Sequence, residues 1–231
     1  MKSIEIYKKI LLKVNLNDTN GNIRVPKSNA VLIFNEESKK WLNSRLEISN
    51  NSDEKDELHE FLLPDIELKK VEDLKDSTDF YLPDDYFRYS RSYSLASKGK
   101  CKSRVIVNWD IKNKNINTIL TNSNESPSFE YGESPIKIAN FKIKVYRSDF
   151  SVDKVYLDYY KLPPVLDIAG YTRFDGTQSE DVELKYSDDL LDQIISQTAL
   201  SIVRNSQNAE GIQFAKDRVA SEPKNSGSSG T

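Results

Sequence analysis

The sequence has very few of the residues that build disulfides and most zinc sites. Its 231 residues include one cysteine, Cys101, and one histidine, His59. A single cysteine excludes a disulfide within the chain, and this pair cannot supply the nitrogen and sulfur ligands of a structural zinc site. We therefore expect a reducing compartment and no zinc, whereas carboxylates could still bind a hard cation.

Long apolar runs are also missing. No window approaches the roughly 18 consecutive apolar residues that a membrane-spanning helix needs. Residues 1–16 mix lysines and a glutamate with apolar side chains, which is unlike a signal peptide. The chain has only eight glycines, and they form no phosphate-binding loop. We expect synthesis in the cytoplasm, no nucleotide chemistry and no cofactor.

The chain also lacks a strong excess of charge of one sign. Lysine and arginine number 33 against 36 acidic residues, for a net charge of -3. This balance argues against a protein that wraps a phosphate backbone by releasing counterions. A mildly acidic surface suits instead a passage through which DNA moves without being gripped. Hydrophobic residues make up 37% of the chain, which predicts a thin core that gains stability from neighbouring subunits.

Helical periodicity is present at both ends of the chain. Apolar residues spaced by three and four predict a helix over 3–14 behind Ser3 as N-cap, and an antiparallel second helix over 29–48. Near the C-terminus the same spacing predicts a helix over 187–205 and a last helix over 208–220.

Strand patterns occupy the middle of the chain. Residues 86–95 and 104–111 predict a hairpin, and 115–120 predicts one helical turn. Residues 136–145, with a bulge near Ala139, and residues 155–160 predict a second, longer hairpin. The order of helices, strands and helices predicts an α+β fold with an N-terminal helical hairpin and a C-terminal helix pair beside an antiparallel β-sheet with a long hairpin.

This pattern divides the chain into five parts. The expected parts are an N-terminal helical part over 1–63, a β part over 64–160, an extended arm over 161–186, C-terminal helices over 187–221 and a disordered tail over 222–231. The arm begins where Pro163 and Pro164 end a strand, because neither proline can donate a ladder hydrogen bond.

Reactive residues do not gather into a recognisable catalytic motif. The adjacent carboxylates Asp84 and Asp85 fit a turn, and Asp188 and Asp189 fit the positive end of a helix. His59 has no nucleophile in a motif around it. We therefore predict no catalytic or metal site, although a glycosidase that uses carboxylates alone stays open as an alternative.

One segment resembles a known family. The chain contains the motif Tyr159-Tyr160-Lys161-Leu162-Pro163-Pro164, followed by Asp167, Gly170-Tyr171, Asp175-Gly176-Thr177 and the helix over 190–203. With these residues it resembles the head-to-tail connector (ring or adaptor) proteins of tailed phages, those of crAss-like phages above all. The corner Leu82-Pro83-Asp84-Asp85-Tyr86 is also similar to structural proteins of this kind. The likeness covers less than half of the chain.

The resemblance implies a place in the phage neck. It implies a structural subunit of the virion, assembled in the host cytoplasm as a ring of twelve copies between portal and tail. Its partners would be the portal protein and other neck or tail ring proteins, and DNA would pass through its channel without sequence-specific binding. It implies neither an enzyme nor contact with a membrane.

A ring of identical copies needs two unlike surfaces on each copy. We expect them on the hairpin over 136–160 and the helix over 187–205. Tyrosine and arginine are enriched at protein interfaces, so the candidate interface residues are Tyr86, Tyr89, Arg91, Tyr159, Tyr160, Pro163, Pro164, Tyr171 and Phe174. Alternatives are a tail-associated module whose aromatic sheet contacts a receptor or a carbohydrate, and a platform for single-stranded nucleic acid.

Overall fold

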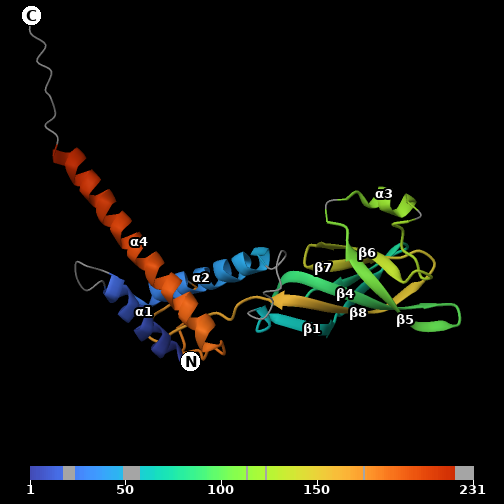
Figure 1. The fold of residues 1–231 in the computed structure, drawn as a ribbon, viewed down its shortest axis with the longest axis horizontal. Helices are drawn as coiled ribbons and strands as arrows, with labels where there is room; N and C mark the ends of the chain where they lie inside the picture. Colours follow the sequence, from blue (N-terminus) through green and yellow to red (C-terminus); the bar gives the residue numbers. More distant parts are fainter. Residues whose placement is uncertain (18–23, 49–57, 113, 123, 174, 222–231) are drawn as a thin grey trace, which may run out of the picture. The chain divides into compact units, whose positions relative to one another are not determined.

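The computed structural model describes residues 1–17, 24–48, 58–112, 114–122, 124–173 and 175–221. They form two compact units, a helical unit (Met1–Glu57 with Pro163–Thr231) and a β unit (Leu58–Leu162), seen in Figure 1. Both ends of the chain thus contribute to the helical unit, and the β unit is inserted between them. The α+β class is confirmed, whereas the tail expected over 222–231 lies outside the described residues.

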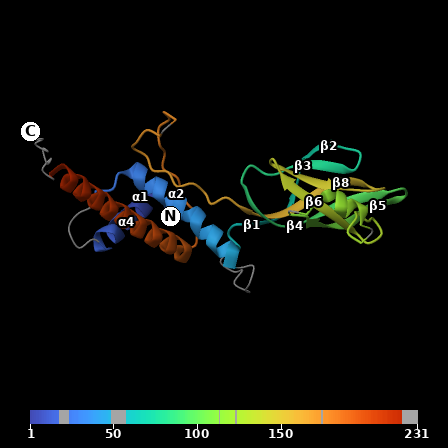
Figure 2. The same ribbon diagram turned by 90° about the horizontal axis from the view of Figure 1, so that it is seen from above.

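In the described residues, the helical unit contains three helices: α1 (Ser3–Asn17), α2 (Lys27–Ile48) and α4 (Asp188–Ser221). α1 and α2 both pack mainly on α4 rather than on each other, and Figure 2 shows α2 running beside α4. Their buried apolar residues recur at helical spacing, as expected for faces that meet in one core. Buried members of this core include Ile6, Ile10, Val14, Phe34, Leu42, Leu46, Leu191, Ile194, Ile195 and Ile202.

The expected C-terminal helix pair is wrong, because α4 is one continuous helix. Between the two expected helices the chain has polar residues over 204–208, and Gly211 follows. Polar residues and glycine cost a helix only about 0.5 to 1 kcal/mol each relative to alanine, and no proline interrupts the segment. Such residues weaken a helix without ending it.

Eight strands form the single sheet of the β unit. Their order is β1-β8-β4-β5-β6-β7-β3-β2. Neighbours are antiparallel except for β5 and β6, which are parallel, so the sheet is mixed where an antiparallel one was expected. The strands are β1 (Leu62–Glu67), β2 (Lys70–Asp73), β3 (Ser77–Tyr81), β4 (Tyr86–Lys98), β5 (Cys101–Asp110), β6 (Glu133–Ala139), β7 (Lys142–Tyr146) and β8 (Ser151–Lys161).

The sheet is curled so that its two ends meet. β1 and β2 stand at opposite ends of the strand order, yet only Leu68 and Lys69 separate them in the chain. The Leu68 amide donates to the Val155 carbonyl of β8, and the Lys69 carbonyl accepts from Tyr81 of β3. This junction therefore brings the two edges together around an apolar interior formed by Leu68, Phe80, Ala96, Ile106, Phe129, Ile136, Ile143, Val145, Phe150, Val152, Val155, Leu157 and Tyr159.

One of the two expected hairpins is present. β4 and β5 pair as predicted, and the helical turn is confirmed as α3 (Ile116–Thr121), capped by Asn115. The long hairpin over 136–160 is wrong. What looked like one bulged strand is β6 and β7 joined by the tight turn at Asn140 and Phe141, and β8 pairs with β1 and β4 rather than with β7. Alternation identifies strands but not their partners.

No helix in the described part of the chain is long and apolar enough to cross a membrane.

Candidate functional site: a pocket between helix α2 and the arm

The arm of the helical unit spans residues 163–186, and its described residues (all but 174) form no helix or strand longer than an isolated bridge. Figure 2 shows it leaving the β unit, running along α2 and turning back toward α4. Hydrogen bonds to α2, within the arm itself and to the start of α1 fix its course. These three attachments position the site.

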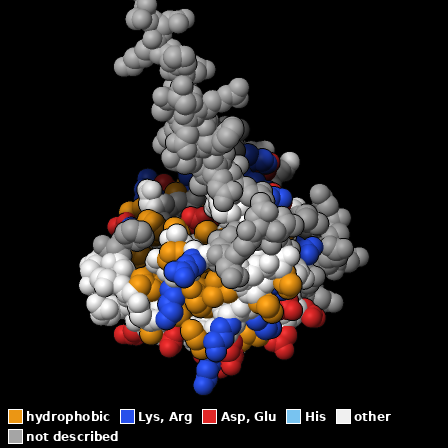
Figure 3. Space-filling model, turned by 90° about the vertical axis from the view of Figure 1, so that its left-hand side faces the viewer, with side chains coloured by type: hydrophobic (Ala, Val, Ile, Leu, Met, Phe, Trp, Pro, Cys, Tyr) orange, Lys and Arg blue, Asp and Glu red, His pale blue; other side chains and the backbone are white. Residues whose placement is uncertain are grey.

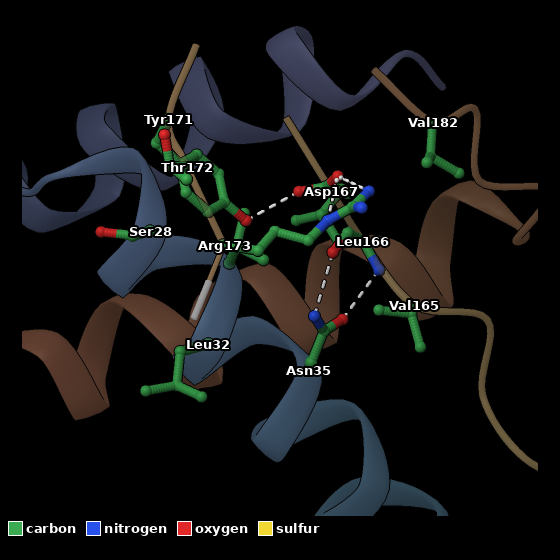
Figure 4. Close-up of a pocket in the computed structure, with 11 residues that line it drawn as sticks. Ser28, Leu32, Asn35, Val165, Leu166, Asp167, Tyr171, Thr172, Arg173 and Val182 are labelled. Atoms are coloured by element: carbon green, nitrogen blue, oxygen red, sulfur yellow. Dashed lines mark hydrogen bonds and ion pairs between the residues drawn. The ribbon is translucent and has the colours of Figure 1, made fainter. Parts of the chain in front are cut away.

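Asn35 attaches the arm to α2. Its Nδ2 donates to the Leu166 carbonyl at 3.0 Å, and its Oδ1 accepts from the Leu166 amide at 2.8 Å (Figure 4). Leu166 is fully buried, so its backbone groups need partners within the protein. The side-chain amide of Asn35 thus supplies the pair of bonds that a neighbouring strand would otherwise supply.

Asp167 holds the arm in its folded course. Its side chain is 8% exposed and pairs with the Arg173 guanidinium at 2.6 Å. It also accepts from the Tyr171 hydroxyl at 2.7 Å and from the Glu180 amide at 2.8 Å. Burial alone would raise the pKa of this carboxyl, but the hydrogen bonds outweigh it and bring the pKa down to about 2. Asp167 is therefore a carboxylate at neutral pH.

The tip of the arm is a tight turn. The Gly176 amide donates to the Arg173 carbonyl, and the Asp175 carboxylate accepts from the Thr177 amide at 2.9 Å. Gly176 adopts φ +83°, a conformation that glycine reaches without strain. Farther back, the Ser179 hydroxyl donates to the Tyr171 carbonyl at 2.6 Å, so both sides of the turn are tied together.

The start of α1 attaches the returning half of the arm. The Ser3 hydroxyl donates to Asp181 at 2.9 Å, and the Ser3 amide donates to the Val182 carbonyl. Ser3 was expected to cap α1 with its side chain. The first helical amides bond instead to the Lys2 carbonyl, which leaves the buried Ser3 hydroxyl for the arm.

An apolar pocket of about 520 Å³ lies between α2 and the arm (Figure 4). Leu32 of α2 is 50% exposed there, and Val165 of the arm is 62% exposed. The pocket is lined by Ser28, Val31, Leu32, Asn35, Val165, Leu166, Asp167, Tyr171, Thr172, Arg173 and Val182.

The polar groups of this α2–arm pocket are largely used by the protein itself. The amide of Asn35 is bonded to Leu166, and Figure 4 shows Tyr171 and Arg173 turned toward Asp167. Burial and the bond to Asp167 raise the pKa of Tyr171 to about 12, so its hydroxyl stays protonated at neutral pH. The surface that remains available to a ligand is chiefly aliphatic.

Three predicted interface residues lie in the helical unit. Tyr171 lines the pocket. The two prolines differ, because Pro163 is buried whereas Pro164 is exposed. The predicted Phe174 lies outside the described residues.

The other predicted interface residues belong to the β unit, and most of them face inward. Tyr159 is 2% exposed and its hydroxyl donates to Asp85 at 2.6 Å, while Tyr86 packs against its ring. Burial raises the pKa of Tyr86 to about 12. Tyr89 and Tyr160 are half-buried. The predicted residues therefore do not form one site.

Arg91, in contrast, lies on the outer face of the sheet. Its guanidinium pairs with the buried carboxylate of Asp158. The outer face also carries the stacked rings of Tyr93 and Tyr156, 5.1 Å apart, which the prediction did not select. Strand alternation could have separated these outward tyrosines from the inward ones if the buried face had been known.

The residues that shape the pocket were mostly missed as site residues. Asn35 carried one weak signal, since asparagine is a poor helix former and stands here in the middle of a strongly helical segment. Leu32, Val165 and Arg173 carry no local pattern that marks them. Their importance comes from a tertiary contact between segments that are about 130 residues apart in the sequence.

Apolar side chains are exposed elsewhere on the helical unit too. Leu12 and Leu16 of α1 and Leu200 of α4 are 62%, 75% and 40% exposed. Figure 3 shows hydrophobic side chains at the surface on one side of the molecule, bordered by basic and acidic ones.

Comparison with protein-family models and with curated proteins gives no match to this chain. Among the described residues, no group of three or more histidine, cysteine, aspartate or glutamate side chains is placed to hold a metal ion.

Proposed function

We propose that this chain is a structural subunit of the neck of a tailed phage, one copy of a ring between portal and tail through which DNA passes. The observation that carries the proposal is the α2–arm pocket, an accessible aliphatic pocket bordered by a hydrogen-bonded arm. Such a pocket suits an apolar side chain of another protein, and a ring needs one binding surface of this kind on every copy.

The arm supports an assembly role because it is ordered before a partner binds. Asn35 and Asp167 hold it by hydrogen bonds among buried groups, so little conformational entropy remains to be lost on binding. A flexible linker would have to be ordered during assembly, at a cost of about 1 to 2 kcal/mol per residue. The arm is also the segment whose motif resembles connector proteins.

The proposal is tested by placing a charge in the pocket. Val165→Asp should leave the thermal stability of the isolated chain nearly unchanged, because Val165 is 62% exposed, and should prevent incorporation into portal-bearing particles. Val105→Asp is the matched control, since Val105 is a 54% exposed valine of the β unit. Incorporation is measured by sedimentation with the particles. Equal incorporation of both variants and the unaltered chain would contradict the proposal.

A further inference from the structure

The turn between β6 and β7 presents an exposed aromatic side chain in a strained conformation. Phe141 is 88% exposed, and both Asn140 (φ +52°) and Phe141 (φ +57°) are left-handed, as in a type I′ turn. The second central position of such turns favours glycine, because a side chain there approaches the backbone. Neither burial nor turn geometry explains a phenylalanine at this position.

Basic side chains lie on the strands β6 and β7 next to this turn. Lys142 follows Phe141 directly, and its ammonium lies 5.8 Å from the centre of the Tyr81 ring. Lys137 and Lys144 are cross-strand neighbours on the outer face, where with Lys142 they line a hollow of about 320 Å³. Asp79, 3.7 Å from Lys144, is the acidic residue lining that hollow. The turn therefore presents an exposed aromatic side chain with lysine side chains beside it.

The α2–arm pocket has the opposite character. Its interior is aliphatic, and the adjoining part of the arm is rich in exposed acidic residues. Arg173, the basic residue of the pocket, is paired with Asp167. The exposed acidic residues of the arm are Asp175, Glu180, Asp181 and Glu183.

We propose that Phe141 of one copy inserts into the α2–arm pocket of the next copy, with the lysines of its turn facing the acidic arm. The proposal rests on the proposed ring and names its subunit contact. A pocket of about 520 Å³ is large enough, since cavities of about 150 Å³ already hold a benzene ring. The contact joins unlike surfaces of two copies, as a closed ring requires. The attraction between the lysines of the turn and the acidic arm would favour this pairing of surfaces over others.

Tyr131 is the other strongly exposed aromatic residue of the β unit, at 84%. Its turn carries Glu130 and Glu133, and Lys98 pairs with Glu130. This turn therefore has no excess of lysines to face the acidic arm, so Tyr131 is a poorer occupant. It serves instead as a matched control.

Cysteine cross-linking between two different chains tests the contact. In a Cys101→Ser background, an Asn140→Cys chain, which keeps Phe141, is mixed with a Val165→Cys chain and oxidised mildly. We expect a disulfide-linked heterodimer at least tenfold more abundant than from a Tyr131→Cys chain mixed with the same partner. Comparable yields from the two mixtures would overturn the contact.

A glycine variant separates this contact from the proposed ring. Phe141→Gly removes the aromatic side chain and relieves the left-handed strain. The melting temperature of this variant should equal or exceed that of the unaltered chain, whereas its assembly into rings should be lost. Assembled rings of Phe141→Gly would overturn the contact and leave the proposed function standing. If the unaltered chain forms no ring, alone or with portal-bearing particles, both proposals fail.

Discussion

Asn35 and Leu166 are joined by two hydrogen bonds: the Asn35 side-chain amide donates to the Leu166 carbonyl and accepts from the Leu166 backbone amide. Asn35→Ala removes both and leaves two buried backbone groups of Leu166 without these partners. We expect a loss of about 2 to 3 kcal/mol in the free energy of unfolding of the helical unit, and faster hydrogen exchange at the Leu166 amide. Asn43→Ala, at an exposed position on the same helix, is the control and should change neither quantity.

The pH dependence of the arm should follow Asp167 and Tyr171. The pKa of Asp167 falls from 3.8 to about 2 on folding, so its stabilisation, about 2 kcal/mol, is complete well above pH 4 and is lost as the pH falls toward 2. The pKa of Tyr171 rises from 10.0 to about 12, so its contribution is present below pH 10 and is lost as the pH rises through 12.

Unfolding by denaturant between pH 2 and pH 7 measures how the free energy of unfolding falls in acid, which is the acid limb of the stability curve. Asp167→Asn should reduce stability at pH 7 and flatten this limb, because the amide does not titrate there. Glu183→Gln is a suitable control, since that carboxylate is exposed elsewhere on the arm. An unchanged acid limb in Asp167→Asn would show that other carboxylates govern acid unfolding.

Replacing each proline separately distinguishes folding from assembly at the start of the arm. Pro163 is buried, so Pro163→Ala should lower the melting temperature by several degrees through lost packing. Pro164 is exposed, so Pro164→Ala should leave the melting temperature within about a degree and weaken assembly instead. Calorimetry and native mass spectrometry measure the two effects. Similar losses of thermal stability in both variants would contradict the assignment of Pro164 to a contact surface.

Much of the fold follows from local pattern. The apolar spacing from Leu190 to Val203 predicted the buried face of α4, because a helix packed on one side must repeat its apolar residues at that interval. The paired prolines correctly marked the end of β8 at Lys161. These features depend on residues close in sequence, which is why sequence alone reveals them.

The arrangement of strands and the pocket could not be predicted in the same way. The pairing of β8 with β1 and β4 rather than with β7 depends on how the sheet curls at Leu68 and Lys69. The pocket depends on Asn35 meeting Leu166, a long-range contact without a local signature. Predicted interface tyrosines such as Tyr159 proved to be core residues, because tyrosine fits equally well a protein surface and a half-polar interior.

The stability of Phe141→Gly gives an energetic test of the β6–β7 turn. Relief of the left-handed conformation is worth about 1 to 2 kcal/mol, and the greater freedom of glycine in the unfolded chain offsets about 0.5 to 1 kcal/mol of it. We therefore expect a β unit that is as stable or up to about 1.5 kcal/mol more stable, as measured by urea unfolding. A clear loss of stability would show that the Phe141 side chain contributes to the fold of its own subunit.

The most direct test of the proposed function is imaging of the chain, alone and bound to portal-bearing particles, by negative-stain and cryo-electron microscopy, with native mass spectrometry of the same samples. The account predicts a closed symmetric layer of identical copies around a central channel, with the arm of each copy at a subunit boundary. Monomers throughout, and particles without an added symmetric layer, would contradict it.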